Sequence, residues 1–489
     1  MKPTILAFDL GTSGNKAVLV DPSTGGLIAA ASAAYPTSFT SDGGAQQDPG
    51  DWWASVAACC AELKARAPRP FDAVAAIGCS GIMNGAVLID DAGNRVRKAI
   101  IHADVRGARH CERVESELGV ETIFRHTQNR LTPLVTMPKL MWLAQAEPET
   151  LARARWVVQA KDYIAGRLTQ TFGYTDPSDA SLTGFYDLRR GCWSEELWRA
   201  SNLARDLRPV VRKSTEILGT VTREAAAQTG LKQGIPVAIG GGDGACASAG
   251  SGAATGQAYI SLGGTSWLGT IRDDPLDDIR VSSYCCLDQR VTSYGTVQSA
   301  GSAIEWVAGL LAGGAMDLDE LERLAQEAQT GDLYFLPYLQ GERAPVWNSH
   351  VRGVFLGLSS HHGRGEMFRA AIEGVACALR SIIDVFAQAG ALEGDLRLIG
   401  GGTRSALWRN ALSALSARRL GLVAEQASAT STGASMAAGV GVGMYESIAD
   451  AARLVRIERW DQSDQAQVDR YEEYYRRWSR IYPAVKGLF

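Results

Sequence analysis

The sequence lacks the spaced cysteine and histidine patterns that mark metal and redox sites. Its nine cysteines include two adjacent pairs, Cys59–Cys60 and Cys285–Cys286, but no CxxC motif. An odd, unpatterned set is typical of reduced thiols. The six histidines contain one adjacent pair, His361–His362, and no HExxH motif, and no GxSxG elbow accompanies a Ser-His-Asp order. Zinc, redox and hydrolytic chemistry are therefore excluded as leading hypotheses.

An excess of positive charge is also absent. Lys and Arg number 49 against 53 for Asp and Glu, which gives a net charge of -4 and no long basic run. This balance argues against a nucleic-acid surface or a polybasic membrane patch. The apolar run before Asp9 is too short for a secretory signal. The uncharged stretches 244–271 and 426–445 do not predict membrane spans, because they are built from Gly, Ala, Ser and Thr rather than Leu and Ile. We expect a cytoplasmic protein with a small-molecule partner, and the sequence leaves a homodimer open.

Glycine is abundant and clustered. The chain has 489 residues, enough for two to four domains or two large lobes, and 53 of them are glycine. Several clusters follow a short apolar run directly, which indicates loops at the carboxyl ends of strands, where open α/β sheets bind ligands. The clusters are "DLGTSG" (9–14), "IGGGDGA" (239–245), "SLGGTS" (261–266), "SAGSA" (299–303) and "IGGGTRS" (399–405).

Two of these clusters resemble each other. "DLGTSGNKAVLV" and "SLGGTSWLGTI" both read as a strand, a turn of Gly, Thr and Ser, and a second apolar run, with Ser261 in the second copy where the first has Asp9. We interpret them as equivalent parts of a duplicated lobe, with the boundary in the small-residue segment 245–257. Two unrelated hairpins that share common turn residues are the alternative.

Three stretches have helical patterns. Residues 366–386 place apolar side chains at the spacing of one buried stripe, at 368, 371, 372, 375, 379, 382, 383 and 386. Residues 430–444 are small after their opening Thr and Ser, so a helix there can pack very close to its neighbour. The polar and aromatic stretch 467–478 predicts a surface helix.

The first strand ends on a carboxylate that precedes a turn without bulky side chains. Gly11, Thr12, Ser13 and Gly14 offer free backbone N–H groups and two hydroxyls, a suitable cradle for phosphate oxygens, and Asp9 would face the accompanying metal ion. The GxxxxGK[ST] motif is absent, and the following "KAVLV" predicts a strand rather than a helix. An ordinary hairpin turn is the alternative.

A second aspartate follows three glycines at the expected start of a helix. Asp243 in "IPVAIGGGDGACASAG" could be an N-cap, which is the commonest use of Asp at such a position. The three glycines instead favour a carboxylate that a substrate can approach, and such a group can accept the proton of a hydroxyl during phosphoryl transfer. In "GGGTRSALWRN" (400–410) the glycines would admit a flat ring or permit tight strand-helix packing.

In order and spacing, these clusters resemble the FGGY carbohydrate kinases of the actin-like, RNase H-like ATPase superfamily, with the xylulokinase branch most similar. The resemblance runs almost end to end. The matching segments are "DLGTSGNKAVLV", "SGIMNGAVLID", "HADVRG", "PKLMWL", "KDYIAGRLT", "TDPSDAS", "IGGGDGA", "SLGGTS", "GERAP", "GVFLGLSSHHGRGEMFRAAIEG" and "GGGTRSALWRN".

The resemblance implies an α/β, two-lobed actin-like fold with lobes at 1–250 and 251–489, and ATP and Mg²⁺ as cofactors. It implies that Asp243 is the general base and also contacts the sugar, and that Asp9 is the acid associated with Mg²⁺. Residues implied at the phosphates are Gly11, Thr12, Ser13, Lys16, Gly264 and Thr265, those near the nucleoside are Gly301 and Gly402, and those at the sugar are Met83, Asn84, His102 and Asp104.

Two positions depart from the xylulokinase pattern. Asn84 stands where those enzymes usually have histidine, and His102 where they usually have tryptophan. D-Xylulose is therefore the first expected substrate, and another ketose or a polyol, such as ribulose, erythrulose, glycerol or a sugar alcohol, is the alternative. A non-catalytic actin-like nucleotide sensor is the hypothesis from another class, and it would have no use for Asp243 in a glycine-rich pocket. An RNase H-like nuclease is disfavoured by the charge balance.

Overall fold

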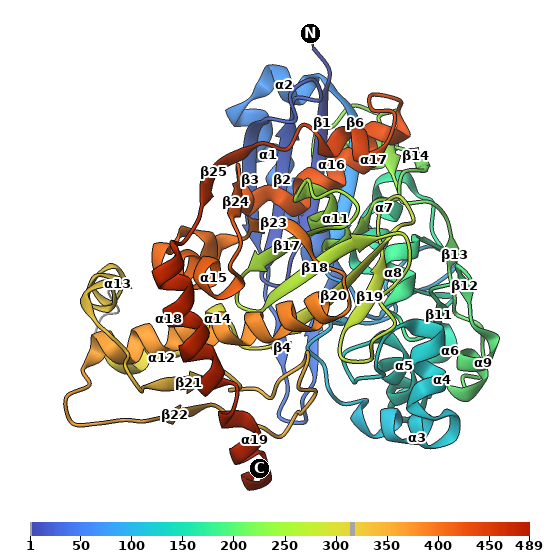
Figure 1. The fold of residues 1–489 in the computed structure, drawn as a ribbon. Helices are drawn as coiled ribbons and strands as arrows, with labels where there is room; N and C mark the ends of the chain where they lie inside the picture. Colours follow the sequence, from blue (N-terminus) through green and yellow to red (C-terminus); the bar gives the residue numbers. More distant parts are fainter. Residues whose placement is uncertain (1, 313–317) are drawn as a thin grey trace. The chain divides into compact units, whose positions relative to one another are not determined.

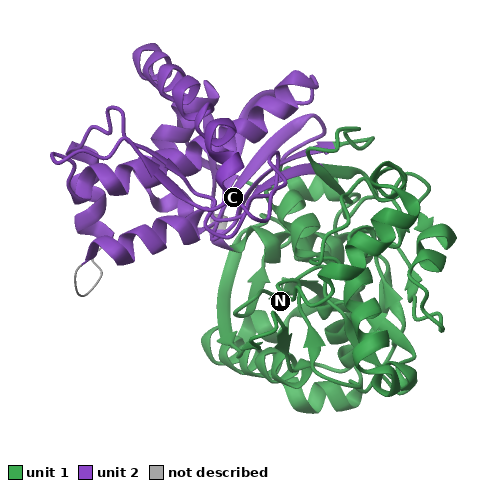
Figure 2. Cartoon of the chain, turned by 90° about the horizontal axis from the view of Figure 1, so that it is seen from below, with its two compact units in different colours: residues 1–252, 272–292, 428–455 green, residues 253–271, 293–427, 456–489 purple. Residues whose placement is uncertain are grey.

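The computed structural model describes residues 2–312 and 318–489, which form two compact units. Unit 1 comprises residues 1–252, 272–292 and 428–455, and unit 2 comprises residues 253–271, 293–427 and 456–489 (Figure 2). The chain therefore crosses between the units several times. The expected lobe boundaries, 1–250 and 251–489, stay a prediction.

Unit 1 is built on a mixed sheet in the order β14-β15-β6-β1-β2-β3, with β16 also paired to β6. The pair β1–β2 is antiparallel, whereas β1–β6 and β6–β15 are parallel. The strands are β1 (Thr4–Leu10), β2 (Gly14–Val20), β3 (Leu27–Ala34), β6 (Val74–Gly81), β14 (Ile217–Thr220), β15 (Pro236–Ala238) and β16 (Gly241–Gly242).

The central strands are buried on both faces because helices cover each side. Phe8 and Cys79 belong to the core cluster that also contains residues of α1 (Pro49–Arg66). Gly78 faces the other side, where α16 (Ala429–Gly441) packs against β1 and β6. A Cβ at Gly78 would lie only 2.1 Å from the Ala434 carbonyl oxygen, so the small-residue helix predicted at 430–444 is confirmed as a close-packing helix.

Unit 1 has many other elements that do not cover this sheet, because residues 108–153 and 195–200 gather to one side of it around a second hydrophobic core (Figure 1). Its further helices are α2 (Pro68–Asp72), α3 (Ala108–Leu118), α4 (Val120–Thr127), α5 (Thr136–Ala146), α6 (Pro148–Arg153), α7 (Ala160–Thr169), α8 (Pro177–Ser181), α9 (Glu195–Ala200), α10 (Arg223–Thr229), α11 (Asp243–Gly250) and α17 (Ile448–Ala452). Its short strands are β4 (Ser38–Phe39), β5 (Ala45–Gln47), β7 (Val87–Ile89), β8 (Ala99–Ile100), β9 (Trp156–Val158), β10 (Tyr174–Thr175), β11 (Tyr186–Asp187), β12 (Cys192–Trp193), β13 (Val210–Val211) and β19 (Ser282–Cys285).

Unit 2 repeats the sheet topology of unit 1. Its strands run β20-β18-β17-β23-β24-β25, with an antiparallel β17–β18 hairpin and parallel β17–β23 and β23–β24 pairs. The strands are β17 (Gln257–Leu262), β18 (Ser266–Arg272), β20 (Val291–Val297), β23 (Glu393–Ile399), β24 (Leu420–Val423) and β25 (Ile457–Asp461), with β21 (Tyr334–Leu336) paired to β22 (Val354–Leu356) apart from the sheet. The β17–β18 hairpin takes the place of β1–β2, which confirms the duplicated lobe.

The helices of unit 2 follow the predicted patterns. Residues 366–386 lie within α14 (Arg364–Gln388), and all eight apolar positions of the expected stripe are buried. The predicted C-terminal helix is α18 (Gln465–Trp478). The other elements are α12 (Gly301–Ala312), α13 (Leu318–Glu327), the 3₁₀ turn η1 (Gly401–Arg404), α15 (Ala406–Ser416) and α19 (Ile481–Val485).

Candidate active site

The turn between β1 and β2 presents its hydroxyls outward. The Gly11 N–H donates to the Gly14 carbonyl at 2.9 Å and closes the turn, and the Thr12 and Ser13 side chains are exposed. Gln47 Nε2 donates to the Thr12 carbonyl at 2.7 Å and holds the turn from the side. Two exposed hydroxyls on a fixed turn match the predicted phosphate contacts.

Asp9 is the last polar residue of β1 and lies in register with Lys16 on β2 and Ser80 on β6. Its Oδ1 atom is buried and accepts no hydrogen bond from any residue that the structure describes. Burial raises the pKa of this carboxyl to about 6, although the positive charge of Lys16 opposes the shift. An unsatisfied buried carboxylate oxygen is costly, and a hydrated Mg²⁺ would satisfy it. The residues present therefore fit the implied metal ion.

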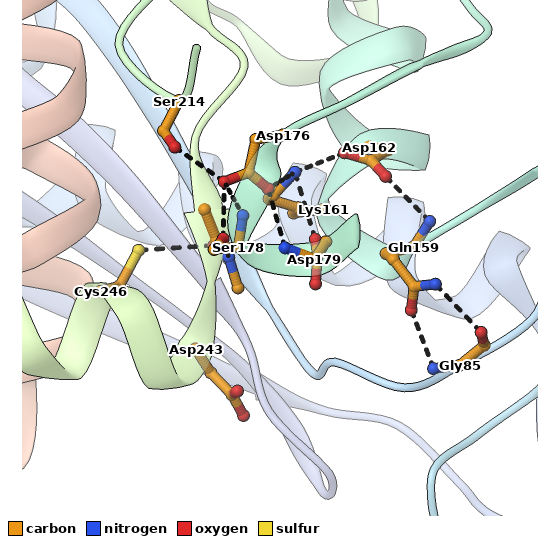
Figure 3. A network of polar contacts seen from close by, with 12 residues as sticks. Gly85, Gln159, Lys161, Asp162, Asp176, Ser178, Asp179, Ser214, Asp243 and Cys246 are labelled. Atoms are coloured by element: carbon orange, nitrogen blue, oxygen red, sulfur yellow. Dashed lines mark hydrogen bonds and ion pairs between the residues drawn. The ribbon is translucent and has the colours of Figure 1, made fainter. Parts of the chain in front are cut away.

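Asp243 is the first residue of α11, directly after β16 (Figure 3). Its Oδ1 accepts a hydrogen bond from the Gly244 N–H at 2.8 Å. Burial, followed by the negative charge of Asp9, raises the pKa of Asp243 to about 7, and the Gly244 bond only partly offsets this. A carboxyl that titrates near neutral pH can both accept and release a proton, as a general base must.

The three glycines before Asp243 have packing reasons in the structure. Gly240 has φ +77°, and a Cβ there would lie 1.9 Å from the Cys79 carbonyl oxygen. At Gly241 a Cβ would meet the Leu287 side chain at 2.2 Å, and at Gly242 it would meet the Met83 side chain at 2.5 Å. The sequence interpretation gave these glycines one purpose, access for a substrate. The contacts give them a second purpose, because they let the Asp243 turn pack closely against its neighbours, and access for a substrate stays a prediction.

Of the predicted sugar contacts, Met83 and Asn84 follow β6. The Met83 side chain is buried and lies against Gly242, next to Asp243. Asn84 has φ +66°, and its buried Oδ1 finds no hydrogen-bond partner among the described residues. A left-handed conformation is uncommon outside glycine, although Asn tolerates it better than most residues. The Asn84 amide oxygen is therefore available to accept a hydrogen bond.

Asp104 is almost completely buried, and its carboxylate already has partners. It accepts hydrogen bonds from the Ala45 N–H at 2.9 Å and from the Arg106 guanidinium at 2.6 to 3.2 Å. The Arg106 guanidinium stacks 3.7 Å from the centre of the Trp142 ring. Asp104 therefore fixes Arg106, which the sequence interpretation did not single out although it stands within "HADVRG". His102 is half-buried two residues before Asp104.

In unit 2, the β17–β18 turn and the start of α12 are joined by backbone hydrogen bonds. Gly263 O accepts from the Gly301 N–H at 2.9 Å, and Gly264 O accepts from the Ser302 N–H at 3.1 Å. A Cβ at Gly301 would lie 2.6 Å from the Gly263 oxygen, whereas Gly264 has open space around it. Gly264 and the exposed Thr265 thus form an open turn. The predicted phosphate and nucleoside glycines come together within this unit.

Gly402 belongs to η1, directly after β23. A Cβ there would lie 2.5 Å from the Trp408 ring and 2.9 Å from the Leu262 Cβ at the end of β17. The close approach supports the packing alternative stated for "GGGTRSALWRN". The adenosine contact of Gly402 stays a prediction.

Two sheets of one topology, each with a glycine-rich hairpin turn and a parallel strand beside it, are the architecture of the actin-like ATPase fold. The family model for the N-terminal domain of FGGY carbohydrate kinases matches residues 4–250, and that for the C-terminal domain matches residues 258–442. This chain belongs to the FGGY family of carbohydrate kinases, and it is an ATP- and Mg²⁺-dependent sugar kinase.

Individual relatives agree with the family. A xylulose kinase of Escherichia coli is 34% identical over 421 residues, which cover 85% of each chain. A gluconokinase of Bacillus subtilis is 28% identical over 430 residues, covering 84% of this chain and 83% of the relative. A solved structure of a "xyloylose kinase" from Brucella ovis superposes with a TM-score of 0.91 at 30% identity and covers 99% of this chain and 100% of its own.

Two further findings apply to the residues that the structure describes. No helix among them is both long and apolar enough to cross a membrane. The same residues contain no group of three His, Cys, Asp or Glu side chains arranged to hold a metal ion.

Proposed function

We propose that this kinase transfers the γ-phosphate of ATP to a terminal hydroxyl of a small ketose, with D-xylulose as the first candidate and D-xylulose 5-phosphate as its product. The observation that carries the proposal is the placement of Asp243, a carboxyl with a pKa near 7 at the start of α11 and beside Met83. The similarity to xylulose kinases along 85% of the chain supports the sugar.

In the proposed reaction, the sugar hydroxyl oxygen forms a bond to the γ-phosphorus while the bond from that phosphorus to the β–γ bridging oxygen breaks. Asp243 orients the hydroxyl and accepts its proton, so that the products are the sugar phosphate and ADP. When bound, ATP with Mg²⁺ supplies the phosphoryl group and neutralises charge on its oxygens. Asp9 would hold the metal ion through its unsatisfied oxygen.

The predicted phosphate contacts come from both hairpin turns, as this function requires. In unit 1 they are Gly11, Thr12, Ser13 and Lys16, and in unit 2 they are Gly264 and Thr265, with Gly301 and Gly402 proposed near the nucleoside. The exposed hydroxyls of Thr12, Ser13 and Thr265 support these roles.

A second candidate substrate class follows from Asn84. Its unpartnered buried oxygen accepts a hydrogen bond, and an amide has two donors besides, whereas a neutral imidazole has one donor and one acceptor. A ketose or polyol with another hydroxyl pattern would form other hydrogen bonds with this amide. So would a sugar acid such as gluconate, the substrate named for the gluconokinase relative.

A panel assay separates these candidates. ADP release is measured with pentuloses, tetruloses, glycerol, hexitols and gluconate at equal concentration, and the best substrate is taken to full kinetics with Asp243→Asn as the inactive control. We expect the highest kcat/KM for D-xylulose. A higher value for any other compound would replace D-xylulose with that compound. ATP binding without phosphate transfer to any of them would refute the proposed substrate class.

A further inference from the structure

Unit 1 contains a buried lysine that takes no part in the proposed reaction. Lys161 Nζ forms ion pairs with Asp162, with Asp176 at 3.0 Å and with Asp179 at 3.2 Å, and these four side chains are at most 2% exposed. We call these four residues the Lys161 cluster (Figure 3). Burial raises the pKa of Asp179 well above its usual value, and the Lys161 charge opposes the shift.

One branch of hydrogen bonds leads from the cluster to the predicted base. Asp176 Oδ2 accepts from the Ser178 hydroxyl at 2.6 Å, and Ser178 Oγ accepts in turn from the Gly242 N–H at 2.9 Å. Gly242 directly precedes Asp243 and is the N-cap of α11, without a side chain of its own to fix the turn. Ser178 therefore holds the backbone from which the Asp243 side chain projects.

A second branch leads to the segment predicted to contact the sugar. Asp162 Oδ2 accepts from the Gln159 N–H at 2.9 Å. The Gln159 side chain accepts from the Gly85 N–H at 2.8 Å and donates to the Gly85 carbonyl at 3.1 Å. One amide thus holds both polar groups of the residue that follows Asn84, whose backbone is in the left-handed region.

We propose that the Lys161 cluster is a positioning device that fixes two active-site segments relative to each other, Gly242–Asp243 through Ser178 and Asn84–Gly85 through Gln159. The proposal rests on the proposed function, which makes Asp243 the base and Asn84 a sugar contact. In this proposal the cluster residues act through Ser178 and Gln159 and do not contact the substrate.

Stability alone is a weak reason for such a cluster. Replacing a buried ion pair with apolar residues of similar volume is often neutral or stabilising, because desolvation offsets the attraction between the charges. Among the described residues, the two Asp179 oxygens accept no hydrogen bond and only pair with the Lys161 charge. The two branches that leave Asp176 and Asp162 are continuous chains of hydrogen bonds, and such chains fix one geometry more sharply than apolar contacts do. Catalytic groups need that precision, since small displacements of a base cost large factors in rate.

Two serines provide a matched pair of variants. Ser178 and Ser214 are both buried, and both hydroxyls donate to Asp176 Oδ2, at 2.6 and 2.7 Å, but only Ser178 accepts from Gly242. We expect Ser178→Ala to lower kcat about tenfold or more with the sugar KM changed less than about threefold, the scale of one lost buried hydrogen bond. Ser214→Ala should keep kcat within about threefold.

A conservative change and an exchange measurement complete the test. Ser178→Cys, which keeps a weak acceptor, should have an intermediate kcat and serves as the test variant if Ser178→Ala does not fold. Hydrogen exchange of the backbone amides in the peptide containing Gly242 should be faster in Ser178→Ala and unchanged in Ser214→Ala. Equal losses of kcat in the two serine variants, or exchange at Gly242 that is unchanged in Ser178→Ala, would overturn the proposal.

The second branch has its own readout. Gln159→Leu removes both hydrogen bonds to Gly85, and we expect the sugar KM to rise about tenfold while kcat changes less. A loss confined to kcat would contradict the assigned branch. Failure of the proposed function can be distinguished from failure of the proposal that the Lys161 cluster positions the two segments. A wild-type protein that phosphorylates no sugar refutes the function, whereas exchange at Gly242 still decides whether Ser178 fixes that turn.

Discussion

At the scale of single residues, two carboxyls of unit 1 share a raised pKa but differ in what surrounds them. Asp9 has an oxygen without a partner beside Lys16, which suits a cation, whereas Asp243 accepts one backbone bond and has Asp9 as its charged neighbour. Environment rather than residue type separates the proposed metal-associated acid, Asp9, from the proposed base, Asp243.

The first prediction concerns the dependence of activity on pH. Asp243 must be ionised to accept a proton, and burial together with Asp9 raises its pKa to about 7. The active fraction therefore rises with pH through about 7, and kcat/KM for the sugar should fall about tenfold per pH unit below it. A profile measured from pH 5 to 9 with ATP saturating tests this. A flat profile down to pH 5 would contradict the assignment of Asp243 as the base.

The second prediction is the effect of removing that base. Asp243→Asn keeps the size of the side chain but cannot accept the proton, so kcat should fall by about 10²- to 10⁴-fold while ATP binding persists. Turnover and nucleotide titration on one preparation measure both quantities. Asp9→Asn is the comparison: it should weaken the use of Mg²⁺ and ATP and leave sugar binding intact. Retention of a tenth of wild-type turnover by Asp243→Asn would exclude the proposed role.

The third prediction tests substrate choice. The double change Asn84→His with His102→Trp restores the residues usual in xylulokinases at both positions. If the native sugar differs from D-xylulose, the double variant should gain kcat/KM for D-xylulose and lose it for the native sugar by roughly ten- to hundredfold, the scale of one mismatched buried polar group. If the wild type already prefers D-xylulose and the variant is impaired on it, neighbouring residues complete an ordinary xylulose site.

At this scale the sequence predicts some features better than others. The Asp9 turn follows from an apolar run, an acid and Gly-Thr-Ser, because such local patterns determine a hairpin. The Lys161 cluster could not be predicted in the same way, since "KDYIAG" and "TDPSDAS" read as ordinary polar residues until the fold brings them together. The same holds for the Asp104–Arg106 pair, whose burial depends on Trp142 far along the chain.

At the scale of elements, small residues set the distance between helices. A Cβ at Gly433 of α16 would lie 1.9 Å from the Cys246 carbonyl of α11, and one at Gly250 of α11 would lie 1.8 Å from the Ala429 carbonyl. The sequence predicted a close-packing helix from composition alone. Which element it packs against was not predictable, because α11 and α16 are separated by almost two hundred residues.

The fourth prediction follows from this contact. Gly433→Ala should lower the free energy of unfolding by about 1–3 kcal/mol, because the added methyl would meet a backbone carbonyl, which cannot move aside as a flexible side chain can. Gly309→Ala is the matched control, since Gly309 lies in α12 with nothing within 4 Å of the added atom. It should be neutral or stabilising by up to about 1 kcal/mol, the helix propensity difference. Equal effects in urea denaturation would refute the packing argument.

At the scale of the whole molecule, each unit contributes some of the predicted phosphate contacts. The duplication was predictable because the two hairpin turns have similar sequences. The exchange of segments between the units was not predictable, because no local sequence pattern indicates which sheet a helix from a later part of the chain will cover. The homodimer stays a prediction.

The fifth prediction concerns motion between the units. Kinases must exclude water to suppress hydrolysis of ATP, and closure on the sugar is the common solution. Small-angle scattering with saturating sugar should therefore give a smaller radius of gyration than without it. A compound from the substrate panel that is not phosphorylated serves as the control. An unchanged radius in an enzyme that turns over that sugar would exclude closure.

The return of residues 428–455 to unit 1 has a consequence for biosynthesis. Helix α16 covers β1 and β6, which are synthesised long before it. The first segment of unit 1 ends at residue 252 and its last begins at residue 428, so at about 5–20 residues per second the delay is on the order of ten to thirty-five seconds. The face of β1 and β6 that awaits α16 stays unfilled during that time. We therefore expect this apolar face to be a binding surface for chaperones until α16 has emerged from the ribosome.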